Sequence, residues 1–156
     1  MRAFLERLAR RPQICPIRGN NTRTKQEGTF ELYKKAIKQR QAEVQFNSGL
    51  MYYEGEGTAQ NYNVAFEYFT KSAKQGNAKA QYRLGQCYLD GKGIHKNDKK
   101  AFEWIKKAVE QGHTPALENL ASMYLNGRGT TKDYQKACEC WAEMQRGLIE
   151  IHIKYA

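Results

Sequence analysis

The chain has 156 residues, of which 40% are hydrophobic and 27% are charged, with ten tyrosines and six phenylalanines. This composition suits one ordinary domain with an apolar core and excludes a wholly disordered chain. No apolar run approaches the roughly 18 residues of a membrane span, and the N-terminus lacks the unbroken apolar stretch of a secretory signal. We therefore expect an intracellular, cytoplasmic protein.

The net charge is +10, and half of this excess lies in residues 1–28. Within Met1–Arg11 an apolar helical side faces away from the arginines, and Pro12 ends the pattern. The apolar side consists of Phe4, Leu5 and Leu8. Such a segment is typical of a mitochondrial presequence, although it contains Glu6 and no serine. We expect residues 1–28 to form a basic leader, with mitochondrial targeting as the alternative localisation; a membrane-surface arm, a docking peptide or a disordered tail are the other interpretations.

From residue 29 onward the sequence repeats every 36 residues. Small residues recur at 49, 85 and 121, tyrosines at 52, 88 and 124, and alanines at 65, 101 and 137. The segment 30–33 lies 36 residues before the similar segment 66–69, so half a repeat precedes the first whole one. We divide the chain into a half repeat at 29–41, repeats at 42–77, 78–113 and 114–147, and a C-terminal tail or cap at 148–156.

Each repeat predicts two antiparallel helices. In the first, Val44, Ser48 and Tyr52 and their equivalents have the spacing of one helix face. The small residue at 49, 85 and 121 lowers helix propensity, so we interpret it as the contact point inside each hairpin. The Gly-x-Gly segments at 55–57, 91–93 and 127–129 end this helix and start a turn; they lack the strand and spacing of a phosphate-binding loop.

The second helix is expected to begin near Asn61, Asn97 and Asp133, which are residue types that cap helix N-termini. Gly76 and Gly112 suit its C-terminal end. Since neither helix can bury its apolar side alone, the hairpins must stack on one another. The sequence therefore predicts an all-α, right-handed α-solenoid of antiparallel helix pairs.

The pattern Ala80-x3-Leu84-Gly85-x2-Tyr88-x2-Gly91-x-Gly93, with Ala101, Trp104, Ala108 and Gly112 after it, resembles the Sel1-like repeat, a relative of the tetratricopeptide repeat. The resemblance covers about residues 29–147 and implies a scaffold or adaptor that binds another protein or peptide. A cysteine-rich branch of that family, with paired disulfides in each repeat, is linked to β-lactam binding or hydrolysis. The four cysteines of this chain, Cys15, Cys87, Cys138 and Cys140, show no such pairing and are expected to be free thiols.

By analogy with tetratricopeptide grooves, the resemblance implies that the first helices face a concave surface that holds the partner. The positions expected to touch it are Glu43, Phe46, Leu50, Tyr53, Glu54, Lys79, Tyr82, Gln86, Leu89, Asp90, Glu118, Ser122, Leu125 and Asn126. Aromatic anchors flanked by polar groups suit a peptide or helix in a groove. We hypothesise that Tyr53 and Tyr82 contribute to partner binding; the alternative is that these rings pack against the neighbouring repeat.

We expect neither catalysis nor a cofactor or metal. The histidines, His95, His113 and His152, show no spacing of a metal or catalytic site. RNA association is the alternative function, because the sequence pI is about 9.5. The densest basic cluster in the repeats consists of Lys96, Lys99, Lys100, Lys106 and Lys107.

The segment 147–155 alternates in a way that looks strand-like, and a capping turn over the last helix pair is the other interpretation. An exposed solenoid end requires a cover. If this segment does not provide one, we expect self-association.

Overall fold

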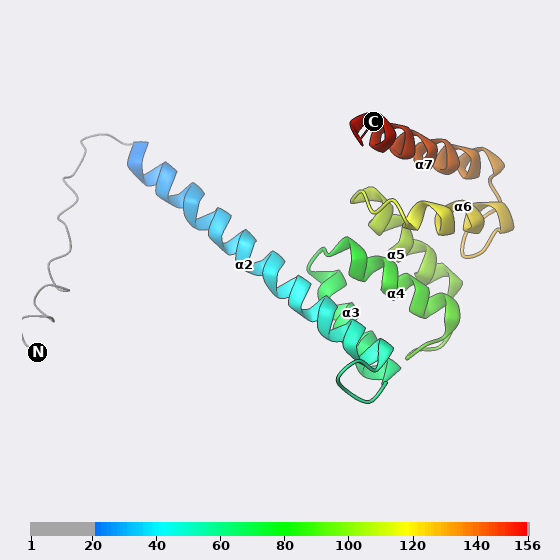
Figure 1. Cartoon of the computed structure of the whole chain (residues 1–156), viewed down its shortest axis with the longest axis horizontal. Coiled ribbons are helices and arrows are strands. Elements are labelled where there is room, and N and C mark those ends of the chain that lie inside the picture. The colour runs from blue at the N-terminus through cyan, green and yellow to red at the C-terminus, as the bar shows by residue number, and fades with distance from the viewer. Residues whose placement is uncertain (1–20, 156) are drawn as a thin grey trace, which may run out of the picture. The chain divides into compact units, whose positions relative to one another are not determined.

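A computed structural model describes the backbone of residues 21–155 and the side chains of residues 28–155. Within these residues the secondary structure is entirely helical (Figure 1). The helices are α2 (Asn21–Glu54), α3 (Tyr62–Lys74), α4 (Ala78–Asp90), α5 (Asp98–Glu110), α6 (Ala116–Asn126) and α7 (Tyr134–Tyr155). The chain divides into two compact units, residues 1–35 and residues 36–156.

The described part of the first unit is the beginning of α2. Phe30, Leu32 and Tyr33 are all more than half exposed there. The Lys34 ammonium lies 3.1 Å from a Glu31 carboxylate oxygen and 4.4 Å from the centre of the Phe30 ring. The helix begins at Asn21, inside the predicted leader, whereas the presequence-like segment at 1–11 lies outside the described residues.

In the second unit the predicted capping residues begin the second helix of each repeat. The Asn61 side chain accepts hydrogen bonds from the backbone N–H groups of residues 63 and 64, and Asn97 accepts one from Lys100 N–H at 3.0 Å. Asp133 accepts one from Lys136 N–H at 3.0 Å, which lowers the pKa of its carboxyl. These bonds satisfy donors that the first helical turn leaves unpaired.

The small-residue column is the contact point inside the first two hairpins, as predicted. A β-carbon on Gly49 would lie 2.7 Å from the ring of Phe69, and one on Gly85 would lie 2.5 Å from Ile105. Both of these large side chains are fully buried. The glycines therefore let the two helices of a hairpin approach closely, and this close packing builds the core.

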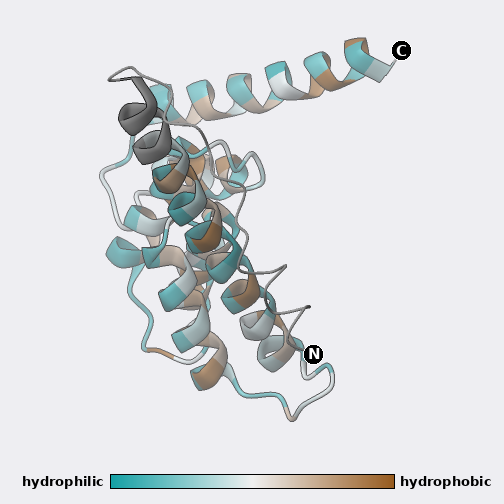
Figure 2. Ribbon diagram, turned by 90° about the vertical axis from the view of Figure 1, so that its left-hand side faces the viewer, coloured by the Kyte–Doolittle hydropathy of each residue, from teal (hydrophilic) through white to brown (hydrophobic). Residues whose placement is uncertain are grey.

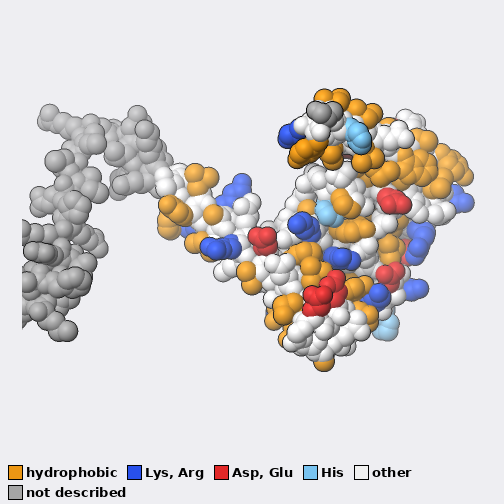
Figure 3. Space-filling model, in the orientation of Figure 1, with side chains coloured by type: hydrophobic (Ala, Val, Ile, Leu, Met, Phe, Trp, Pro, Cys, Tyr) orange, Lys and Arg blue, Asp and Glu red, His pale blue; other side chains and the backbone are white. Residues whose placement is uncertain are grey.

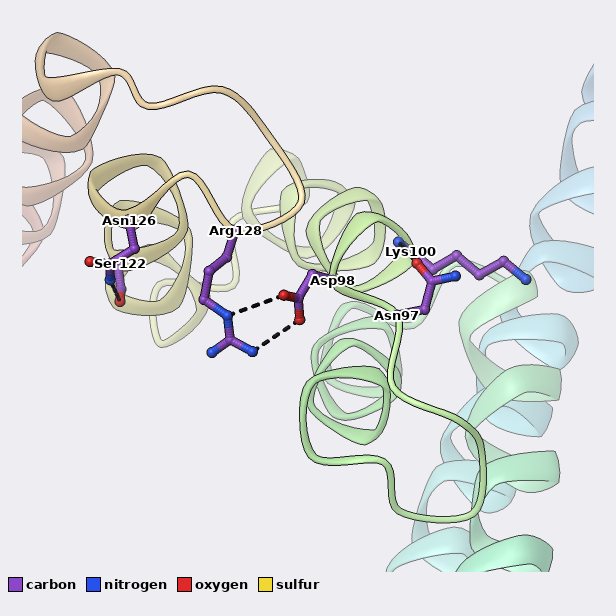
Figure 4. Close-up of polar contacts among 6 residues, drawn as sticks. All are labelled: Asn97, Asp98, Lys100, Ser122, Asn126 and Arg128. Carbon is purple, nitrogen blue, oxygen red and sulfur yellow. Dashed lines mark hydrogen bonds and ion pairs between the residues drawn. The ribbon is translucent and has the colours of Figure 1, made fainter.

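The Gly-x-Gly loops have a second role that the sequence did not reveal. Their first glycines close the helices, and Gly91 does so in the left-handed conformation with φ 70°. The second glycines lie against the preceding repeat: a β-carbon on Gly93 would overlap the carbonyl oxygen of Tyr62, and one on Gly129 that of Asp98. The same loop is tied by Arg128, which donates to Asp98 at 2.9 and 3.4 Å (Figure 4).

Successive hairpins share their apolar cores. Figure 1 shows their helices stacked one after another from α3 to α7. Phe66 of the first repeat packs edge-on against Tyr88 of the second, with ring centres 5.5 Å apart. Phe102 and Tyr124 repeat this contact at 5.3 Å between the second and third repeats. Each repeat thus covers the apolar side of the next one.

Both ends of the array differ from the expected repeat boundaries. Internal repeats turn at Gly76 and Gly112, where φ is 92° and 83°. The equivalent positions hold Arg40 and Leu148, which do not favour a left-handed conformation, and the helices continue through them. No turn therefore separates the predicted half repeat from the first repeat, and α2 runs on into residues 42–54.

The strand-like interpretation of residues 147–155 is wrong, because these residues continue α7. The alternation of isoleucines misleads because Leu148 stands where Gly112 closes the previous second helix, so α7 continues past this position. The side chains of these isoleucines, Ile149, Ile151 and Ile153, are more than half exposed.

Candidate protein-binding surface

The candidate surface is the accessible side of the first helices in the second unit, namely residues 42–54 of α2, α4 and α6. All fourteen residues that the sequence selected lie on these helices, and none of them is buried. The exposed ones are Glu43, Glu54, Lys79, Asp90, Glu118, Ser122 and Asn126. The half-buried ones are Phe46, Leu50, Tyr53, Tyr82, Gln86, Leu89 and Leu125.

One end of this surface is hollowed. A depression of about 530 Å³ lies between α2, the turn from α3 to α4 and the turn from α5 to α6. Three selected residues line it, namely Glu43, Phe46 and Lys79. Its lining also includes residues that sequence reasoning missed, which are Gln39, Ala42, Asn47, Gln75, Gly76, Asn77, Ala78, Gln111, Gly112 and His113.

Glutamine side chains at this depression link the first helix of a repeat to the end of its second helix, and one of them also reaches the preceding repeat. Gln75 donates to the Gln45 side chain at 3.1 Å, and Gln111 donates to Gln81 at 3.0 Å. Gln81, which is buried, donates in turn to the Ala73 carbonyl at 3.2 Å. Gln75 and Gln111 directly precede Gly76 and Gly112, which the sequence marked only as the ends of the second helices.

The side-chain oxygen of Gln75 is the notable polar atom of the depression. It is buried and has no hydrogen-bond partner among the described residues. A buried acceptor without a partner is unfavourable, and a rotation of the Gln75 side chain that exposes the oxygen to the depression would let an N–H group of a ligand satisfy it.

His113 also lines the depression. Its ring centre lies 5.0 Å from that of Tyr82. Burial, together with the positive charges of Lys79 and Arg83, lowers the pKa of His113. The imidazole is therefore neutral near pH 7 and does not add to the positive charge of Lys79.

Tyr53 has contacts across a repeat boundary. Lys92, in the next Gly-x-Gly loop, donates to its hydroxyl at 2.9 Å, and this hydrogen bond raises the pKa of the lysine. The ring lies edge-on to Tyr62 with centres 5.1 Å apart.

Tyr82 also bridges two repeats. Its hydroxyl accepts hydrogen bonds from Gln86 at 2.9 Å and from Asn119 of α6 at 3.2 Å. Packing between repeats therefore accounts for part of the surface of both tyrosines, and the remainder stays accessible.

The predicted basic cluster lies on α5 and the loop before it, with all five lysines exposed. Lys107 lies 4.5 Å from the centre of the Trp104 ring, and Lys106 lies 4.0 Å from Glu110. These contacts are within one helix, as expected for a solvated outer side. RNA association stays a prediction.

The described residues contain no group of three or more histidines, cysteines or carboxylates that could hold a metal ion. The three cysteines of this part of the chain are unpaired; Cys87 and Cys140 are buried and Cys138 is exposed. Burial raises the pKa of Cys87 to about 11, so its thiol is protonated and unreactive. None of the described helices combines the length and the apolar character that a membrane crossing requires.

Comparison with known proteins identifies the repeat. The Sel1 repeat model matches residues 42–77, 78–113 and 114–143. The chain belongs to the Sel1 repeat family. Proteins built from these repeats generally act as protein-interaction scaffolds and are mostly non-enzymatic. No curated protein matches the chain.

Solved structures share the fold. A Sel1 repeat protein from Oxalobacter formigenes is 35% identical with a TM-score of 0.66, and the match covers 69% of this chain and 43% of that one. The protein c5321, a protective antigen present in uropathogenic Escherichia coli strains, is 29% identical with a TM-score of 0.67, covering 76% and 25%. Cysteine rich protein B of Helicobacter pylori, at 23% identity, a TM-score of 0.57 and coverage of 72% and 86%, shows the fold alone. The matched region spans less than half the length of the first two relatives.

Proposed function

We propose that this chain is an interaction scaffold that binds a peptide or helix of another protein along α2, α4 and α6. The observation that carries the proposal is the depression beside Phe46, where the buried Gln75 oxygen lacks a partner among the described residues. An apolar anchor with a few convergent polar groups is the usual composition of a peptide-binding site.

The residues around the depression define the chemistry of the partner. Phe46 is half-buried and offers a ring surface to an apolar side chain. The Gln75 oxygen suits an N–H donor, which an extended peptide backbone supplies. Glu43 and Lys79 are exposed at the border, so they favour a partner that carries both charge signs.

A displayed library of random peptides, selected against the full chain, supplies a probe for this site. The affinity of one selected peptide is then measured by fluorescence anisotropy for the native chain and for the double variant Glu43→Lys/Lys79→Glu. We expect the exchange of charges to weaken binding at least tenfold, because both groups face the bound segment. The exposed position Glu103 on α5 provides the control variant Glu103→Lys, which should bind as the native chain does.

Tyr53 and Tyr82 require a different substitution. Alanine would remove the contacts with Lys92 and Asn119 as well as any contact with the partner. Phenylalanine keeps the ring and removes only the hydroxyl. Binding through the ring predicts that the alanine variants lose affinity while their helical circular dichroism is unchanged, and that the phenylalanine variants lose little affinity. Peptides that bind the native chain and both sets of variants equally would refute the proposed surface.

A further inference from the structure

The first helices of the second and third repeats bury one side against the preceding hairpin. The buried positions are Ala80, Leu84 and Cys87 in the second repeat and Ala116, Leu120 and Met123 in the third, each no more than 5% exposed. In the first repeat the same positions are Val44, Ser48 and Met51, and Val44 and Met51 are 60% and 48% exposed. We call this side of α2, together with Ile37, the leading face.

The last repeat shows the complementary surface. The side of α3 that meets α4 includes Phe66, and the side of α5 that meets α6 includes Phe102. Their equivalent on α7 is Cys138, which is exposed. Nearby, Trp141 is 37% exposed, although its equivalents Phe69 and Ile105 are fully buried. We call this side of α7, with Tyr134, Leu148 and Ile149, the trailing face.

The glycine loops indicate the same pairing. Gly93 and Gly129 lie against the backbone of the preceding repeat at Tyr62 and Asp98. Gly57 has the same left-handed conformation, but the nearest atom to a β-carbon there is its own repeat's Met51 at 3.5 Å. The Gly57 loop therefore has the conformation that, in the other two loops, contacts the start of the preceding repeat's second helix. The equivalent residue at the start of the last second helix, on the trailing face, is Tyr134, which is 64% exposed.

Both faces extend beyond the length of an internal repeat. Because Arg40 and Leu148 replace the closing glycines, α2 and α7 run on where the internal chain turns. Each extension carries a shallow, largely apolar depression. One is lined by Ile37, Arg40, Gln41, Val44 and Gln45, and the other by Leu148, Ile149, His152 and Ile153. Figure 3 shows hydrophobic side chains gathered over α7, and Figure 2 shows hydrophobic turns near its C-terminal end.

We propose that the trailing face of one copy of this chain binds the leading face of a second copy, head to tail. The argument is the continuity with the interface between repeats, which the chain forms twice within itself by the same positions. Transferring the Phe66–Tyr88 contact by the repeat period places Cys138 against Tyr52 of the second copy. Antiparallel helices in that alignment then bring Ile149 and Ile153 beside Gln41 and Ile37 of the second copy.

This interface joins two different surfaces, so binding leaves one leading face and one trailing face uncovered at the ends of the pair. Such a heterologous contact continues to longer assemblies instead of stopping at a symmetric dimer. The mean mass of the chain in solution should therefore rise with concentration. The contact surface is separate from the proposed peptide-binding surface on α2, α4 and α6.

The test uses two variants of the full chain, each blocked at one face. The leading-face variant is Ile37→Glu/Val44→Glu, and the trailing-face variant is Leu148→Glu/Ile149→Glu. All four positions are more than half exposed, so these changes leave the repeat core intact, which circular dichroism verifies. Light scattering after size exclusion gives the mass of each variant and of their equimolar mixture.

We expect each variant alone to be monomeric and the mixture to form a dimer, because one free leading face and one free trailing face remain. The tryptophan emission of the mixture should shift to the blue as Trp141 becomes covered. A native chain that stays monomeric at high micromolar concentration would overturn the proposal. Self-association of either blocked variant alone would overturn it too, since that result requires a symmetric contact.

A single substitution checks the alignment of the two faces. Asparagine tolerates the left-handed conformation of Gly57, but its β-carbon would meet the helix start at Tyr134 of the second copy. Gly57→Asn should abolish the rise in mass, whereas the control Gly76→Asn, at a turn with no atom within 4 Å of a β-carbon, should not. Equal masses for Gly57→Asn and the native chain would contradict this alignment.

Discussion

Three glycines of equal conformation allow the contact between repeats to be measured. Gly57, Gly93 and Gly129 have φ values of 72°, 74° and 71°. Alanine at any of them is strained by about 1–2 kcal/mol, because L-residues rarely adopt this conformation. The three sites differ only in what a β-carbon would meet, so the common backbone term cancels when they are compared.

The β-carbon of Gly57→Ala would have only the flexible end of Met51 at 3.5 Å. At Gly93 it would lie 2.8 Å from the carbonyl carbon of Tyr62, and at Gly129 it would lie 2.6 Å from that of Asp98. Since backbone cannot give way as a side chain can, the preceding helix must move, and such overpacking costs about 1–3 kcal/mol more. We expect destabilisation of about 1–2 kcal/mol for Gly57→Ala and about 2–5 kcal/mol for the other two.

Urea unfolding followed by circular dichroism measures these differences. The experiment is performed at low concentration, so that association between copies does not contribute. Equal losses of stability at the three sites, within about 0.5 kcal/mol, would refute the assignment of the second glycine to the contact between repeats.

Three further predictions concern single side chains. Cys138 should react promptly with a thiol reagent and Cys87 only after unfolding, because Cys87 is buried and its pKa is raised to about 11. Mass spectrometry of labelled peptides measures both reaction rates, and equal rates would contradict the burial of Cys87. The lowered pKa of His113 means that the unfolded state binds more protons, so the folded state should lose stability as the pH falls from above the ordinary value of 6.5 to below it. His113→Gln should reduce this loss, which urea midpoints measured across that pH range detect. An unchanged pH profile in the variant would exclude His113 as the cause. Asn97→Ala should lower stability by about 0.5–2 kcal/mol, because the hydrogen bond from Lys100 N–H is lost, while Asn97→Ser keeps an acceptor and should retain most of it; thermal unfolding of the two variants tests the cap.

Much of the fold follows from local rules that depend only on the residue types within each repeat. Asn61 and Asn97 act as helix caps because a short side-chain acceptor reaches the backbone donors of the next turn. Gly49 and Gly85 mark close helix contacts because any other residue there would collide with Phe69 or Ile105. The period of 36 then predicts which columns are buried, and the second and third repeats confirm it at Ala80, Leu84, Ala116 and Leu120.

The candidate surface was predictable in position but not in detail. The selected residues are accessible, yet the contacts of Tyr53 and Tyr82 with neighbouring repeats depend on Lys92 and Asn119, which lie 39 and 37 residues further along the chain. The Gln75 oxygen is buried through the packing of two turns. Such contacts depend on side-chain distances, which the repeat period alone does not specify.

The sequence by itself determined the helical hairpins, their caps and their stacking order, because these depend on residue type and spacing within one repeat. Only the tertiary structure decided what happens at the two ends. There the repeat pattern predicts buried columns at Val44 and Trp141, but burial requires a neighbour, and the described residues provide none. The same side chains are core in the middle of the array and surface at its ends, since exposure is a property of what lies alongside a residue.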